Sequence, residues 1–407
     1  MAPRRLSLPD SMNGSQKEDL QSRRQLLRWG LGAGGLLLVD GWGTAAAALA
    51  RTQAQGGSGP RGGFELLDVI PFASENRNFI GELAGEGRSG RRSLDLGRLT
   101  SKSLVTPIDR FFVRTGHPSG LDSVANWKIV IDGLVEEPGA LGLEELEAMA
   151  VPLGAQVLEC AGSTRNSGFG LMSAAEWHGV PMREVLESVV PRPEAARVLV
   201  SGLDPETGPF PGGNWIFSLD ELADAGAALA TRMNGVPLPE LHGRPLRLVV
   251  PGWYGCCWVK WVTRVTWLPD AAAATSQMRE FAGRTHQQGM PRLAREYAPA
   301  VIDPVALPVR IEMWRRDSGL FYRVVGVTWG GRPPTPRPAV RLAPGGQFVP
   351  VENYAPAATA TWSLWSHLWQ PERPGKYAID LRFEDPALQT RRMDAGYYRR
   401  SVVIPEV

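Results

Sequence analysis

A cysteine follows a glutamate at the end of an apolar run in the stretch VLECAGSTRNSG, residues 157–168. Cys160 is one of only three cysteines in the chain, and small residues and Arg165 follow it. A cation near a thiol favours the thiolate, the form that acts as a nucleophile or a metal ligand. The pattern leaves four roles open for Cys160, namely a buried apolar residue, a nucleophile, a redox group and a metal ligand.

The remaining cysteines and histidines narrow these roles. The sequence has no Cys-x-x-Cys pair, and its five histidines and three cysteines are too scattered for a zinc site of roughly three or four ligands. Cys256 and Cys257 are neighbours, and a disulfide between adjacent residues is strained. We interpret both as core or turn residues.

A second stretch, residues 231–267, places cations among apolar and turn-forming residues. His242, Arg247 and Lys260 interrupt segments whose neighbours look buried, and buried cations require anionic partners. Arg binds phosphate through two parallel hydrogen bonds and Lys binds it as a point charge. The stretch indicates an anionic ligand, such as a phosphate, held between two strands and a turn. The alternative is that these cations lie on the solvent face of a sheet.

Composition and periodicity predict the elements that must position these residues. Fourteen Trp and 34 Pro in 407 residues favour short strands joined by loops over a helical bundle. We expect an α+β fold, because the strands outnumber the helical segments that could join them. Strands are expected at 109–117, 126–135, 196–204, 244–252 and 257–267, and short helices at 142–150 and 181–189.

The pattern changes towards the C-terminus. Residues 276–300 are polar with weak periodicity, and we interpret them as a connector that crosses the surface. From residue 301 to 407, short alternating segments are separated by Gly and Pro, which predicts an immunoglobulin-like β-sandwich. The sequence therefore predicts a first domain at 64–275 and a second at 301–407.

The N-terminal residues are typical of an export signal. Arg23-Arg24 precedes a Gly-rich apolar stretch that ends in Ala-Leu-Ala at 48–50, which resembles a twin-arginine signal with a cleavage site. Residues 1–50 are interpreted as this signal and 51–63 as a flexible tail, so a periplasmic location is expected. A membrane anchor is the alternative, but the stretch falls short of about 20 consecutive apolar residues, and no later stretch is a spanning candidate.

Five motifs occur together in the order and spacing of one family: FFVRTGH, ECAGSTR, AAEWHGVPMREVLE, SGLDPETG and MNGVPLPELHGRPLRLVVPGWYGCCWVKWV. In these motifs the chain resembles the sulfite oxidase family of molybdenum enzymes, over residues 64–407. The resemblance implies a mixed α/β molybdopterin-binding domain at 64–275 and an immunoglobulin-like dimerisation domain at 301–407. It also implies the molybdenum–molybdopterin cofactor, with Cys160 as the metal ligand.

The resemblance implies roles for further residues. Arg165 matches an arginine that helps to hold an oxyanion substrate, and Thr231 occupies the position of an active-site tyrosine. The family has a histidine two residues after the arginine of the first motif; this chain has Gly116 there, and His117 follows. The implied cofactor contacts are Phe112, Val113, Arg114, Thr115, His117, Asp204, His242, Arg247, Trp258, Val259 and Lys260.

The resemblance also implies an activity, namely oxygen-atom transfer on a small anionic substrate. Oxidation of sulfite or a related sulfur compound is expected, and LMSAAEWHGVP is similar to bacterial sulfite and sulfane dehydrogenases. The sequence has no Cys-x-x-Cys-His haem attachment motif, so an external acceptor, such as a c-type cytochrome or a haem subunit, would take the electrons.

Two alternatives remain open at this point: a molybdenum-dependent sulfoxide-type reductase on the same scaffold, and a secreted β-rich binding protein without metal. A net charge of +2 without blocks of like charge argues against a nucleic-acid partner. A homodimer through the C-terminal domain is expected from the resemblance.

Overall fold

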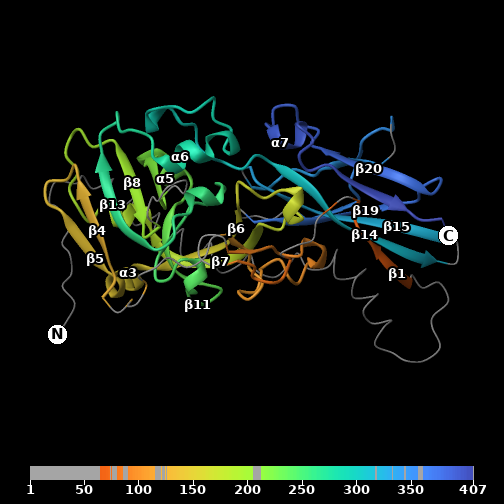
Figure 1. Cartoon of the computed structure of the whole chain (residues 1–407), viewed down its shortest axis with the longest axis horizontal. Coiled ribbons are helices and arrows are strands. Elements are labelled where there is room, and N and C mark those ends of the chain that lie inside the picture. The colour runs from red at the N-terminus through yellow and green to blue at the C-terminus, as the bar shows by residue number, and fades with distance from the viewer. Residues whose placement is uncertain are drawn as a thin grey trace, which may run out of the picture. The chain divides into compact units, whose positions relative to one another are not determined.

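The computed structural model arranges the described residues, all between 65 and 406, in three five-stranded sheets, one four-stranded sheet, a two-stranded sheet and short helices (Figure 1). The expected signal at 1–50 and tail at 51–63, together with Thr115 and His117, lie outside the described residues. The structure describes residues 65–73, 75, 80–85, 90–114, 121, 124, 126–204, 212–316, 319–331, 333–342, 345–355 and 361–406.

Two five-stranded sheets form the part of the structure that contains Cys160. The first has the order β11-β10-β7-β6, with β12 also pairing with β10; its strands are β6 (Val151–Glu159), β7 (Met172–Pro181), β10 (Ala228–Met233), β11 (Val236–Pro237) and β12 (Arg247–Val249). The second has the order β5-β4-β13-β8-β9; its strands are β4 (Lys128–Gly133), β5 (Gly139–Gly142), β8 (Arg197–Gly202), β9 (Asn214–Ser218) and β13 (Val262–Leu268). Within the second sheet only β4 and β13 are parallel. Both sheets contribute to one hydrophobic core.

Most of the expected elements in this part are confirmed. The strands expected at 126–135 and 196–204 are β4 and β8, and the expected helices are α3 (Leu143–Met149) and α4 (Met182–Leu186). Another helix, α5 (Leu219–Asp224), begins with the Ser218 side chain accepting a hydrogen bond from the Glu221 N–H, the usual serine N-cap. None of the helices within the described ranges combines the length and apolar character needed to cross a membrane.

The expectation of a surface connector at 276–300 is wrong. This stretch begins with α6 (Ser276–Phe281), which the Thr275 side chain caps by accepting from the Met278 N–H. Met278, Ala282 and Ala294 are buried in the same core as the two sheets. Polar residues surround these three positions, so the stretch is polar on average. The buried residues are also too few to give a detectable helical periodicity.

Two sheets that share a core form the C-terminal part. One has the order β1-β14-β15-β19-β18 and the other β17-β16-β20-β21; Figure 1 shows β14, β15 and β19 running side by side. Ile311 and Trp365 from the first sheet meet Val340 and Val402 from the second. The strands are β1 (Glu65–Ile70), β14 (Val305–Arg316), β15 (Gly319–Trp329), β16 (Ala339–Arg341), β17 (Val349–Pro350), β18 (Asn353–Tyr354), β19 (Ser363–Trp369), β20 (Gly375–Arg382) and β21 (Arg400–Ile404).

Two chain segments cross the boundary between these two parts. Strand β1 lies at the start of the stretch assigned to the first domain, yet it pairs antiparallel with β14. In the other direction, α7 (Arg391–Asp394) and the residues up to β21 reach the turn after Cys160, where the Arg392 guanidinium donates to the Ala161 carbonyl. The C-terminal sheets are therefore in direct contact with the chain around Cys160.

Gly326 in β15 provides a test of the packing between β15 and Trp365 in β19. A Cβ at this position would lie 2.1 Å from Cζ2 of Trp365, which is fully buried. We expect Gly326→Ala to lower the free energy of unfolding by about 1–3 kcal/mol, the usual cost of overpacking. Chemical denaturation measures the change. The control is Gly283→Ala, whose added Cβ has nothing within 4 Å, with an expected change of less than about 0.5 kcal/mol. Equal stability of the two variants would contradict the packing described.

Candidate active site

A pocket of about 790 Å³ opens beside Cys160, a size typical of ligand pockets, which span about 300–1,000 Å³. Among the described residues its lining is strongly basic, with Asp204 and Glu280 as the acids. The structure brings together eight of the residues that the sequence singled out: Phe112, Arg114, Cys160, Asp204, Arg247, Trp258, Val259 and Lys260. The cations in the lining are Arg91, Arg114, Arg247, Lys260 and Arg284.

Cys160 follows β6 directly and begins a tight turn. Its N–H donates to the Leu171 carbonyl at 2.9 Å, and its carbonyl accepts from the Ser163 N–H at 2.9 Å. The Gly162 N–H donates to the Cys160 Sγ at 3.4 Å. Burial raises the pKa of the thiol, while this N–H and the charge of Arg114 act in the opposite direction. The thiol therefore keeps its proton at neutral pH until a metal or another electrophile displaces it.

Arg247 in β12 is the most deeply buried cation of the pocket. Its Nη1 donates to the His242 carbonyl at 3.1 Å and its Nη2 to the Trp258 carbonyl at 3.4 Å. The Nε is buried and has no hydrogen-bond partner within the part of the chain that the structure describes. Burial lowers the pKa of Arg247 to about 9, so the guanidinium stays charged at neutral pH. A buried donor without an acceptor is unfavourable, which indicates that an anion completes this site.

Lys260 lies next to Arg247, because the two residues form an isolated antiparallel bridge. Its Nζ is 4.1 Å from the centre of the Trp261 ring, a cation–π contact. Desolvation lowers the pKa of Lys260 to about 7; the charge of Asp204 raises it, and those of Arg247 and Arg114 lower it further. An anion bound between Arg247 and Lys260 would hold the ammonium in its charged form.

His242 acts on the pocket through its backbone. The imidazole is 3% exposed, and it packs edge-on against Phe111 with ring centres 5.1 Å apart. Burial, followed by the charges of Arg247 and Lys260, lowers the pKa of His242 to about 3, so the ring is neutral. It lies outside the pocket lining, while its carbonyl fixes the Arg247 guanidinium. The sequence singled out His242 as a cofactor contact, and the structure places its side chain outside the pocket lining.

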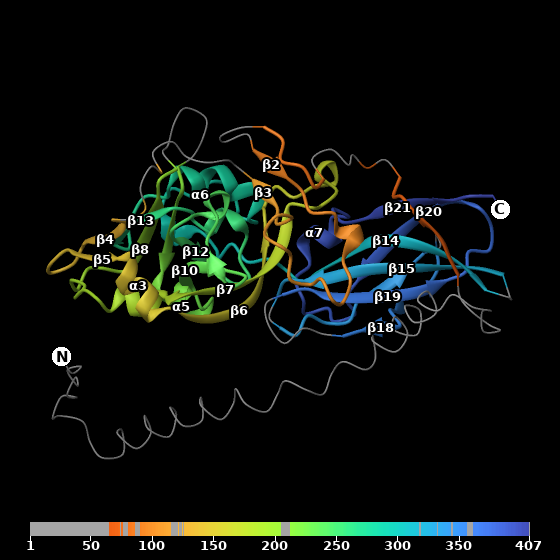
Figure 2. The ribbon, with the colours of Figure 1, turned by 90° about the horizontal axis from the view of Figure 1, so that it is seen from below.

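Strand alternation explains which residues of the 112–114 segment face the pocket. Phe112 and Arg114 line it, whereas Val113 between them is 2% exposed and lies outside the lining. Strand β3 (Val113–Arg114) pairs with β2 (Arg91–Arg92), and Figure 2 shows these two short strands near each other. This pairing places Arg91 opposite Arg114. Burial and the like charges of Arg91 and Arg284 lower the pKa of Arg114. The charge of a Cys160 thiolate would raise this pKa and so offset part of the lowering.

Besides His242 and Val113, two more residues that the sequence singled out lie outside the pocket lining. Arg165 is exposed, and its Nη2 donates to the Arg399 carbonyl at 2.7 Å, although its neighbours Thr164 and Asn166 line the pocket. Thr231 is 2% exposed within β10, at the register shift between β10 and β7, and lies outside the lining.

Arg91, Arg284 and Cys256 are among the pocket residues that escaped the sequence analysis or were given no role at the pocket. Arg91 reaches the pocket through a pairing that no local pattern reveals, and Arg284 follows α6 in the stretch interpreted as a connector. Cys257 is fully buried, as expected, but Cys256 lines the pocket. Within the described ranges, no three His, Cys, Asp or Glu side chains gather into a metal-binding group.

Comparisons with known proteins identify relatives of this chain. Residues 116–275 match the family model described as oxidoreductase molybdopterin binding domain. The chain is 28% identical to the sulfite oxidase of Gallus gallus over 297 residues, which are 66% of this chain and 63% of that protein. It is 33% identical to the nitrate reductase [NADPH] of Aspergillus niger over 199 residues, 43% of this chain and 22% of that protein. The matches therefore span less than two thirds of these relatives.

One solved structure shares the fold. The sulfane dehydrogenase SoxCD of Paracoccus pantotrophus matches with a TM-score of 0.61 at 21% sequence identity. The match covers 80% of this chain and 84% of that chain. It therefore includes parts of the fold beyond the 160 residues, 116–275, of the family model.

The pKa of Lys260 predicts a pH dependence of anion binding. In the cofactor-free protein, the affinity for sulfate is expected to fall as pH rises through about 7, because Lys260 loses its charge there. Stability should change in the opposite direction. The pKa of the folded state lies below the ordinary value of 10.5, so the unfolded chain binds more protons between these values and the free energy of unfolding rises with pH.

Titration calorimetry with sulfate and denaturation at several pH values check both expectations. Sulfate is suitable because its charge is constant across this range. In Lys260→Met, both pH dependences should be weaker than in the wild type. If the variant and the wild type show the same dependences, Lys260 does not titrate near neutral pH.

Proposed function

Because the chain belongs to the sulfite oxidase family of molybdopterin-binding oxidoreductases, we propose that it oxidises sulfite or a related small sulfur anion. The cofactor of the family is molybdenum–molybdopterin. One observation supports the assignment above all others: the Cys160 thiol and the cations Arg247 and Lys260 line the same pocket. A soft thiolate suits a metal, and the cations suit a phosphate.

The residues of the pocket fit this cofactor. Cys160 would bind the metal, and Arg247 and Lys260 would bind the phosphate of the pterin. The buried Nε of Arg247, which has no acceptor within the described chain, would then find one. When bound, the cofactor supplies a metal that takes two electrons from a substrate and releases them one at a time to an acceptor.

The chain itself contributes binding, orientation and the exclusion of water. Trp177 and Trp258 flank the Arg247 guanidinium, with ring centres 5.6 and 5.9 Å from its Cζ. Both indole rings are buried, so they exclude water and strengthen the attraction between this cation and a phosphate. Neutral His242 holds the guanidinium from behind through its carbonyl. The Cys160 proton leaves when the thiol becomes a metal ligand.

We propose that Arg284 attracts the anionic substrate. Arg284 lines the pocket together with Arg114, and its side chain is 51% exposed. Its ion pair with Glu280, at 3.7 Å, is also exposed, and such pairs are weak enough to yield to a bound anion. The sequence assigned this role to Arg165, and comparing the two arginines tests both assignments.

Four further parts of the proposal rest on the sequence. An external acceptor, such as a c-type cytochrome, takes the electrons. The twin-arginine motif at residues 23–24 exports the folded protein to the periplasm. The C-terminal sheets form an immunoglobulin-like domain, and this domain mediates a homodimer.

A reductase is the second candidate. The identity of 33% over 199 residues with a protein named nitrate reductase favours it, because that name describes the reduction of an oxyanion. Nitrate and sulfoxides are the substrates to test for this direction.

The metal content tests the proposed cofactor. Protein purified from a host that makes the cofactor should contain about one molybdenum per chain, and Cys160→Ser should lower this content at least about tenfold. Elemental analysis of folded protein measures both. Cys256→Ser should retain the metal, although Cys256 lines the same pocket. Wild-type protein that folds without molybdenum, in a host whose other molybdenum enzymes are active, would overturn the proposal.

A substrate screen tests the direction and the role of Arg284. Sulfite-dependent reduction of ferricyanide is expected; activity only with nitrate or a sulfoxide and a reduced dye would identify a reductase instead. Arg284→Gln should raise KM about tenfold, the loss expected for a charge-assisted hydrogen bond, and Arg165→Gln less than about twofold. A larger effect in Arg165→Gln would return the substrate role to Arg165.

A further inference from the structure

A short segment near the C-terminus, residues 391–400, holds the turn that carries Cys160. Arg392 Nη2 donates to the Ala161 carbonyl at 3.0 Å, and Tyr397 OH donates to the Ser163 carbonyl at 2.5 Å. In the reverse direction, Arg165 Nη2 donates to the Arg399 carbonyl at 2.7 Å. More than 230 residues of sequence separate each pair, so this turn depends on tertiary contacts.

The residue before Cys160 is held by the same part of the molecule. Glu159 is fully buried, and its Oε2 accepts from Trp329 Nε1 at 2.7 Å. Its Oε1 accepts from Tyr398 OH at 3.0 Å and lies 3.6 Å from Arg392 Nη1. A buried carboxylate requires such partners, since removing one leaves an uncompensated charge. Trp329, Tyr398 and Arg392 all come from the C-terminal part.

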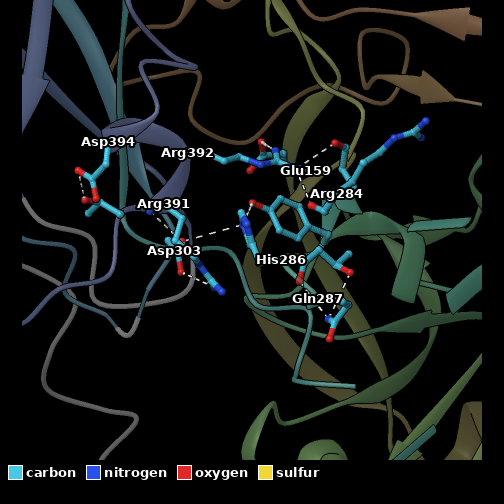
Figure 3. A network of polar contacts seen from close by, with 12 residues as sticks. Glu159, Arg284, His286, Gln287, Asp303, Arg391, Arg392 and Asp394 are labelled. Atoms are coloured by element: carbon cyan, nitrogen blue, oxygen red, sulfur yellow. Dashed lines mark hydrogen bonds and ion pairs between the residues drawn. The ribbon is translucent and has the colours of Figure 1, made fainter. Parts of the chain in front are cut away.

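Arg392 therefore contacts both neighbours of Cys160 at once. Figure 3 shows its side chain extending from α7 towards Glu159. The guanidinium also donates to the Arg284 carbonyl at 2.7 Å, and its Cζ lies 4.4 Å from the centre of the Tyr254 ring. Its side chain is only 10% exposed. With residues 159 and 161 both anchored, the backbone at residue 160 has little freedom.

We propose that Arg392 and Tyr397 are positioning residues of the metal site, and that the C-terminal part thereby completes this site within the same chain. They act through the backbone and the carboxylate next to Cys160, and they fix the thiol so that it faces the pocket. This inference rests on the proposed role of Cys160 as the metal ligand.

Arg391 provides a control that distinguishes the positioning of Cys160 from the overall stability of the protein. It precedes Arg392 in α7, and its Nε and Nη2 each donate to the Asp303 carboxylate at 2.9 Å. Asp303 is buried, like Glu159. No described contact joins Arg391 to residues 159–163. Losing either arginine leaves a buried carboxylate without its cation, but only the loss of Arg392 releases the turn that carries Cys160.

The first experiment measures the reactivity of Cys160 in the full-length chain without cofactor. Protein from a host that cannot make molybdopterin is treated with iodoacetamide, and peptide mass spectrometry gives the alkylation rates of Cys160 and Cys256. Both thiols line the pocket. Dividing the alkylation rate of Cys160 by that of Cys256 therefore cancels any change in the overall accessibility of the pocket. Arg392→Gln should raise this ratio about tenfold, and Tyr397→Phe about threefold, because each removes hydrogen bonds to the turn.

Arg391→Gln is the matched control, with an expected change in the ratio of less than about twofold. An unchanged ratio in Arg392→Gln, or an equal rise in Arg391→Gln, would overturn the proposal. If Arg392→Gln does not fold, Tyr397→Phe decides by the same criterion, since it removes a single hydroxyl.

The second experiment uses protein loaded with cofactor. Arg392→Gln should shift the thiolate-to-metal absorption band or lower the molybdenum content, whereas Arg391→Gln should match the wild type in both. Identical bands and metal contents in all three proteins would contradict positioning. If wild-type protein binds no molybdenum, the proposed function fails, and the alkylation experiment still determines whether residues 391–400 hold Cys160.

Discussion

The ion pair between Glu159 and Arg392 is the interaction on which the rest of the structure depends. It lies between the sheets that carry the pocket and the sheets of the C-terminal part, and both partners are largely withdrawn from water. A buried carboxylate and a buried guanidinium are each costly alone, so the two parts must meet in one arrangement. That arrangement places the turn after β6, and hence Cys160, at the wall of the basic pocket.

A second constraint acts on the pocket, because the cations that line it outnumber the acids among the described lining residues. Of the described residues, five cations and two acids line it, and burial lowers the pKa values of Arg247 and Lys260 to about 9 and about 7. Such a site gains stability from an anion of more than one charge. In the proposed function, the phosphate of the cofactor meets this requirement at Arg247 and Lys260, and Arg114 and Arg284 form the positive region proposed for a small anionic substrate.

Local patterns predicted the elements well where one face of a strand or helix is buried. Strands β4 and β8 and helix α3 follow their apolar alternation or helical spacing closely. The stretch 276–300 failed because its buried residues are few and are surrounded by polar ones. Strand β1 could not be assigned to its partner β14 from the sequence, because more than 200 residues lie between them and pairing over that distance leaves no local signature.

The sequence alone indicated the family and the cofactor, through the resemblance of its motifs, and it selected Cys160, Arg247 and Lys260, which the structure places in one pocket. Only the tertiary structure decided which side chains face the pocket. Arg91 enters it through strand pairing and Arg284 through the packing of α6, whereas Arg165 turns outward to the Arg399 carbonyl. The physical reason is that the direction of a side chain depends on the neighbours that folding provides, and residues 391–400 are such neighbours for the turn of Cys160.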